Sequence, residues 1–183
     1  MARWIDNWTK IAELFTTTLG SVQPSQWDAP TPCADWNLRQ LVGHAIDYQR
    51  GYGVYLGAGE GIDAPLGDDV PGAWVQIRAA LAEVYDRPAT RDRSFDMLTA
   101  LIPGSVADQL IVPTHDLAMH TWDLSQAIGS DVVLPRDICA ELLDALRSTE
   151  PVWRIPEWYG PATTPPAEAD VQTQLVCFTG RTI

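Results

Sequence analysis

The chain has 183 residues, 46% of them hydrophobic and 20% charged, which is typical of one globular domain with a substantial core. Its formal net charge is −12, with 24 acidic residues against 12 basic ones. So acidic a surface repels phosphate backbones and anionic lipid headgroups, which makes nucleic acid and membrane surfaces poor partners.

The cysteines and the first residues bear on the cellular compartment. Cys33, Cys139 and Cys177 are odd in number and far apart, which argues against a disulfide framework. The opening residues, MARWIDNWTK, lack the layout of a secretory signal, and no apolar run is long enough to span a membrane. We therefore expect a cytoplasmic protein.

Apolar periodicity predicts the first two helices. Large apolar side chains recur at steps of three and four from Trp4 to about Val22, which indicates an amphipathic helix, and a proline-rich connector follows. Asn37, with Gln40 three residues later, resembles a capping box and predicts the start of a second helix. Its apolar stripe runs to Tyr52. The glycine-rich segment there lacks the pattern of a phosphate-binding loop, and we interpret it as a connector or lid.

The later part of the chain is also predicted to be mainly helical, with a short extended piece around Phe95–Ile102. Helices are expected at Ala73–Tyr85, Ser105–Ile128 and Arg136–Arg147, and a short closing helix should end at Gly180. Pro113 should kink or divide the helix in which it lies. Long helices with few strands predict an all-α bundle, formed as a single domain over residues 1–183.

The three histidines carry the strongest functional signal. His115 and His120 lie in the segment THDLAMHTWDL, and His44 lies midway along the second predicted helix, facing the bundle interior. Asp116 and His120 are one turn apart on a largely apolar face, whereas His115 is about a quarter turn away, towards the edge. Burying two imidazoles and a carboxylate is costly unless each finds a partner, and a divalent cation would satisfy all three.

The same residues allow interpretations without a metal. Asp116 and His120 could form a helical i,i+4 pair, and an inward histidine is often hydrogen-bonded to a carbonyl or carboxylate in the core. His115 and His120 are five residues apart, so they do not match the zincin motif, whose histidines are four apart. Cys33 lies about three helical turns before His44, so we expect a structural, partly buried cysteine that does not reach a metal.

Three segments resemble a known family. TPCADWNLRQLVGH resembles the Thr-Pro-Cys, Trp, Leu-x-x-His signature of the DinB-like, mycothiol-dependent maleylpyruvate isomerase N-terminal superfamily. DLAMHTWDLSQAIG is similar to that group's Asp-x-x-x-His-x-Trp-Asp-Leu segment, and EADVQTQLVCFTGR is similar to the closing helix of an actinobacterial metal-binding subgroup. The resemblance implies a DinB-like four-helix bundle, here with additional short C-terminal helices, and a divalent metal held by His44, Asp116 and His120.

The sequence departs from the isomerase in two respects. The isomerase has glutamate where this chain has Asp116, a mild departure because the subgroup often uses aspartate. The isomerase also carries a second, C-terminal domain that contributes to its active site, whereas this sequence ends at Ile183. Maleylpyruvate isomerisation itself is therefore not the expected activity.

The implied ligands suit a catalytic site, because two neutral imidazoles and a carboxylate leave coordination positions open for water or substrate. Zinc is the first choice, with nickel, iron or manganese as alternatives. Together with the resemblance, this predicts a transferase or isomerase that activates a low-molecular-weight thiol towards a small electrophile. Tyr48, Trp122 and Asp123 are candidates for the pocket or for support of the ligands, with core packing or surface charge as the alternatives.

Two other functional classes compete with the enzyme. One is a non-catalytic metal-binding or regulatory module, and the other is a plain helical bundle with a hydrogen-bonded His-Asp-His core. Homodimers are common in the superfamily, and exposed helix faces would allow one here.

Overall fold

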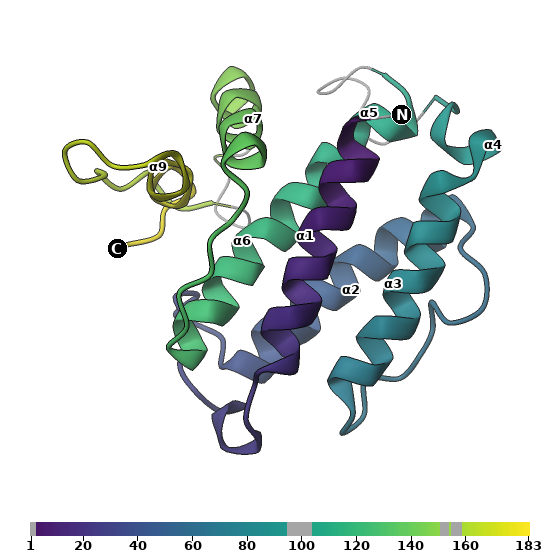
Figure 1. The fold of residues 1–183 in the computed structure, drawn as a ribbon, viewed down its shortest axis with the longest axis horizontal. Coiled ribbons are helices and arrows are strands. Elements are labelled where there is room, and N and C mark those ends of the chain that lie inside the picture. The colour runs from purple at the N-terminus through teal and green to yellow at the C-terminus, as the bar shows by residue number, and fades with distance from the viewer. Residues whose placement is uncertain (1–2, 95–103, 151–153, 155–158) are drawn as a thin grey trace. The chain divides into compact units, whose positions relative to one another are not determined.

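The computed structural model describes residues 3–94, 104–150, 154 and 159–183 (Figure 1). These residues form helices joined by loops and contain no strand; two isolated bridges pair Pro30 with Asn37 and Ser94 with Ser105. Within this part of the chain, no helix combines the length and apolarity that crossing a membrane requires. The chain divides into two compact units, Met1–Val132 and Val133–Ile183, and the single domain expected over residues 1–183 stays a prediction.

Four long helices build the first unit. They are α1 (Arg3–Gly20), α2 (Leu38–Leu56), α3 (Val70–Asp86) and α6 (Ile111–Ile128), and the short helices between them are η1 (Pro24–Gln26), α4 (Pro88–Arg91) and α5 (Val106–Gln109). Both α1 and α2 pack against α3 and α6, so the four close into a bundle (Figure 1). Its core includes fully buried Trp8, Phe15, Leu41, Ile46, Trp74 and Leu81. The prediction of an all-α four-helix bundle is confirmed.

The second unit contains the additional short helices that the sequence predicts. They are α7 (Arg136–Ser148) and α9 (Val171–Phe178), which pack against each other. α9 begins at the N-cap Asp170, whose carboxylate accepts a hydrogen bond from the Thr173 N–H at 2.7 Å. It ends just before Gly180, whose φ of +89° belongs to the left-handed region that glycine adopts readily.

The start of α2 is the predicted capping box, but its end is later than predicted. Asn37 Oδ1 accepts a hydrogen bond from the Gln40 N–H, and the Asn37 N–H donates to Gln40 Oε1, both at 3.0 Å. The helix then continues through two glycines to Leu56 and ends at Gly57, whose φ is +77°. Gly53 is needed for packing, because a Cβ there would lie 2.7 Å from side-chain atoms of the next loop and of α3.

Pro113 divides its helix, as the sequence predicts. The chain forms α5, then a break at Leu110, then α6, and Pro113 lies in the first turn of α6, where its missing N–H leaves no helical bond unmade. α6 ends at Gly129, whose φ is +70°. The extended piece expected at Phe95–Ile102 lies outside the described residues.

Gln49 fixes the positions of three helices relative to one another. Its amide is fully buried, accepts a hydrogen bond from the Trp8 indole N–H of α1 at 2.9 Å and donates to the Pro113 carbonyl of α6 at 2.8 Å. Because a buried amide needs its partners, this link sets where α2 stands against α6. It therefore also sets the distance between His44 on α2 and the polar residues of α6.

Candidate metal centre

Helices α2 and α6 bring together the three residues that the sequence singled out. His44, Asp116 and His120 each offer one ligand atom, and these atoms all lie within 4.8 Å of one another. Oδ1 of Asp116 lies 3.6 Å from His120 Nε2 and 4.0 Å from His44 Nε2. The i,i+4 spacing on α6 stacks Asp116 and His120, and the register of α2 supplies His44. We refer to these three side chains as the His–Asp–His group.

The His–Asp–His group is buried on the α6 side and open on the α2 side. His120 is 7% exposed, and the Asp116 side chain is 16% exposed. The His44 side chain is 40% exposed, more than its predicted inward direction implied. A small molecule can therefore approach the group past His44.

Asp123 supports His120 from the far side. It is fully buried, and its Oδ2 lies 3.0 Å from His120 Nδ1. A carboxylate in this position accepts a hydrogen bond from Nδ1–H and so leaves Nε2 to face Asp116 and His44. Asp123 thus lies beside His120, and its role in supporting a metal ligand stays a prediction.

The two histidines differ in their affinity for protons. Burial lowers the pKa of His44, the neighbouring His120 lowers it further, and Asp47 acts weakly in the opposite direction. Burial also acts to lower the pKa of His120, but the charge of Asp116 and the hydrogen bond to Asp123 outweigh it and raise the pKa to about 10. Near pH 7, His44 offers a neutral imidazole, whereas His120 holds a proton that a cation must displace.

Trp36 is a part of the site that sequence reasoning missed. Its ring lies 4.4 Å from the His44 ring, centroid to centroid, at an interplanar angle of 36°, and 6.1 Å from the His120 ring. Trp36 directly precedes the N-cap of α2, Asn37, and a large aromatic there folds onto the first turns of the helix. Trp36 lies one residue before the helix cap Asn37 and eight residues before the candidate ligand His44. This position in the sequence is the signal that could have identified Trp36 as a neighbour of the site.

Cys33 is partly buried, as the sequence predicts, and that it does not reach a metal stays a prediction. Its Sγ nevertheless lies close to the site, 3.5 Å from Asp123 Oδ2. Cys33, His120 and Asp123 form another group with ligand atoms within 4.8 Å of one another. Helix geometry alone did not anticipate this proximity, because the connector folds back towards α6 instead of continuing the axis of α2.

Three further residues were considered in the sequence. The Tyr48 ring lies 6.3 Å from the His44 ring, and burial raises the pKa of Tyr48 well above its ordinary range, so its hydroxyl stays protonated. Trp122 is 6% exposed, and within the described part of the chain no ring contact links it to either histidine of the group. His115, expected at the edge, is 4% exposed, because α6 is buried on nearly every side.

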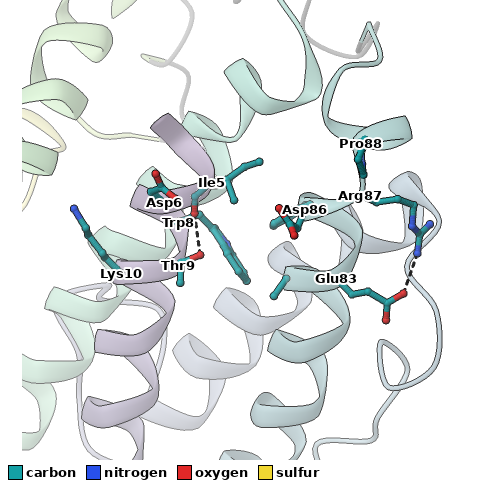
Figure 2. Close-up of a pocket in the computed structure, with 11 residues that line it drawn as sticks. Ile5, Asp6, Trp8, Thr9, Lys10, Glu83, Asp86, Arg87 and Pro88 are labelled. Atoms are coloured by element: carbon teal, nitrogen blue, oxygen red, sulfur yellow. Dashed lines mark hydrogen bonds and ion pairs between the residues drawn. The ribbon is translucent and has the colours of Figure 1, made fainter. Parts of the chain in front are cut away.

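A separate pocket lies between the first turns of α1 and the end of α3 (Figure 2). It measures about 980 Å³, and its charged side chains are Asp6, Lys10, Glu83, Asp86 and Arg87. The charges are of both signs, and Arg87 is paired with Glu83 at 3.2 Å. None of the three histidines lines it, so the pocket does not coincide with the His–Asp–His group.

Fold and site together define a class: an all-α bundle with a candidate metal-ligand group on two facing helices. The family described as "Mycothiol maleylpyruvate isomerase N-terminal domain" matches residues 8–125, and the chain belongs to this family. The match spans all three members of the His–Asp–His group. The expected resemblance is confirmed.

Two curated proteins of Mycobacterium tuberculosis are similar to this chain over most of its length. They are Rv0738 of strain H37Rv and MT0763 of strain CDC 1551, each 31% identical over 179 residues, which covers 93% of this chain and 93% of the relative. Both are described as uncharacterized proteins, so they add no activity. No solved structure matches the chain significantly.

Proposed function

We propose that this protein holds a divalent metal ion through His44, Asp116 and His120 and acts on a small electrophile with a low-molecular-weight thiol, as a transferase or isomerase. The observation that carries the proposal is the convergence of two imidazoles and a carboxylate within 4.8 Å, beside a His44 side chain that is 40% exposed. The family name, which contains mycothiol, supports the thiol class. A cytoplasmic location and a homodimer belong to the same proposal.

The donor set fits a divalent ion. Ligand atoms that share one tetrahedral ion at bond lengths of roughly 2.0–2.2 Å lie about 3.3–3.6 Å apart. The carboxylate oxygen lies 3.6 and 4.0 Å from the two imidazole nitrogens, and all three atoms lie within 4.8 Å of one another, so side-chain rotations would bring them to one ion. Zinc is the first choice, and nickel, iron and manganese accept the same nitrogen and oxygen ligands.

Three protein ligands would leave a position for the thiol, and such an ion when bound supplies a Lewis acid that favours the thiolate at neutral pH. The protein's own residues then provide orientation and shielding. Asp123 holds the His120 ring by its Nδ1–H, and Trp36 covers one face of His44 and excludes water there. Tyr48, which burial keeps neutral, is hydrogen-bonded to Tyr52 and lies near Asp116; it could donate to an oxygen that gains charge if it gave up that bond.

Metal content and thiol transfer test the proposal in sequence. Metal analysis of the purified protein should give one ion per chain in the wild type and in Asp47→Asn, which alters an exposed carboxylate of α2, and none in His44→Ala or His120→Ala. The loaded protein is then assayed with mycothiol-like and bacillithiol-like thiols against several classes of electrophile. Absence of metal from the wild type rejects the proposal. Metal without turnover in any class leaves the non-catalytic metal-binding module as the function.

A further inference from the structure

The connector between α1 and α2 places Cys33 beside the carboxylate that supports His120. Cys33 Sγ lies 3.5 Å from Asp123 Oδ2, and the same oxygen lies 3.0 Å from His120 Nδ1. Asp123 is fully buried, so protein donors rather than bulk water determine where its carboxylate sits. Cys33 therefore lies beside Asp123 and beside the candidate metal ligand His120, and the ligand atoms of all three are within 4.8 Å of one another.

The turn that carries Cys33 is held by its own hydrogen bonds. The Cys33 N–H donates to Thr31 Oγ1 at 3.1 Å, and the Thr31 hydroxyl lies within 3.0 Å of the Cys33 carbonyl and 2.9 Å of the Trp36 carbonyl. The Trp36 N–H donates to the Cys33 carbonyl at 2.8 Å. The Thr31–Trp36 turn thus has one preferred shape, with the thiol near Asp123 and the indole on His44.

We propose that Cys33 is a positioning residue of the metal centre: its thiol donates to Asp123 Oδ2, and this second donor holds the carboxylate where it orients the His120 ring. The inference rests on the proposed function, because the ring orientation matters only if His120 Nε2 binds the ion. Cys33 touches neither substrate nor ion in this arrangement. Its effect reaches His120 through the Asp123 carboxylate and through its own side-chain contact with the ring.

The competing arrangement makes Cys33 a ligand. An ion among Cys33, His120 and Asp123 would use His120 Nδ1, whereas the His–Asp–His group uses Nε2. A neutral imidazole has one N–H and one lone pair, so His120 serves one group or the other. Asp123 is fully buried, whereas the His44 side chain is 40% exposed. Ions and substrates can therefore reach the His–Asp–His group more easily, and we favour it as the metal site.

Metal affinity, measured on the full-length protein by competition with a chelating dye, tests the positioning role. Loss of a group that orients a ligand typically weakens binding by about 10- to 100-fold. We expect about 10-fold weaker zinc binding for Cys33→Ala, recovery for Cys33→Ser, which keeps a donor, and no change for Cys177→Ala, which removes a buried thiol of α9. Wild-type affinity in Cys33→Ala would overturn the proposal.

Two further measurements separate this inference from the metal site itself. Co²⁺ is added to the wild type, and a thiolate-to-cobalt charge-transfer band would make Cys33 a ligand and overturn the positioning role. In EDTA, urea midpoints are compared for Cys33→Ala, Asp123→Asn and the double variant. Non-additive shifts confirm the Cys33–Asp123 contact whether or not the wild type binds metal, and additive shifts overturn the inference. A wild type without metal but with non-additive shifts rejects the proposed function and the metal-centre role of Cys33, and leaves the contact itself standing.

Discussion

Removing either histidine of the His–Asp–His group should abolish metal binding, but the two substitutions should differ in the metal-free protein. His120 is 7% exposed and lies 3.6 Å from Asp116 and 3.0 Å from Asp123. Truncating one partner of a buried charge pair costs about 3–5 kcal/mol, so His120→Ala should lower the free energy of unfolding by that amount. The His44 side chain is 40% exposed and 4.0 Å from Asp116, so His44→Ala should cost less than about 1 kcal/mol.

The metal adds a second, separable effect. An ion present at about 100 times its dissociation constant stabilises the folded protein by about 2.7 kcal/mol. Urea unfolding at pH 7, in EDTA and with zinc, should show this gain for the wild type and for neither variant. If His44→Ala keeps the gain, the ligand assignment is wrong. If His120→Ala is no less stable than His44→Ala in EDTA, the argument from burial is wrong.

Three further predictions concern protons and packing. Burial acts to lower the pKa of His120, but the neighbouring carboxylates raise it to about 10. The charged ring therefore stabilises the metal-free protein fully below pH 6.5, the ordinary pKa of histidine, and this stabilisation is lost as the pH rises through about 10. Zinc binding at pH 8 should accordingly release close to one proton from this ring, measured by calorimetry in buffers of different ionisation enthalpy; release of none would contradict the pKa. Gln49→Leu leaves the Trp8 indole N–H buried without its acceptor, so the free energy of unfolding measured in urea should fall by about 2–4 kcal/mol. A fall of less than about 1 kcal/mol would refute the link that Gln49 makes between the three helices. Gly53→Ala should lower the free energy of unfolding by about 1–3 kcal/mol, because its Cβ would lie 2.7 Å from packed side chains. Gly51→Ala, whose Cβ would have nothing within 4 Å, should be neutral or stabilising. Equal effects of the two substitutions would contradict the close packing at Gly53.

The helices and the candidate ligands could be predicted because their signals are local. The Asn37–Gln40 capping box, the division of the fourth helix near Pro113 and the glycine stop at Gly129 depend on a few neighbouring residues. Asp116 and His120 were found by their one-turn spacing, which any regular helix converts into proximity. His44 needed only the further expectation that α2 and α6 face each other.

The rest depended on tertiary structure. Cys33 and Trp36 reach the site through a connector whose path has no periodicity to predict it. The extension of α2 beyond Gly51 is explained by close packing at Gly53, which overrides the low helix propensity of glycine. His115 is buried because α6 is covered on nearly every side, so a helical wheel cannot distinguish an edge from a face there.

The location of a bound ion tests the central claim most directly. Crystals of the zinc-loaded protein, measured on both sides of the zinc absorption edge, would show the ion as an anomalous peak. The account predicts one peak bonded to Nε2 of His44, Nε2 of His120 and a carboxylate oxygen of Asp116, the three atoms that already lie within 4.8 Å of one another. No peak at these atoms, or a peak bonded instead to Cys33 and Asp123, would contradict it.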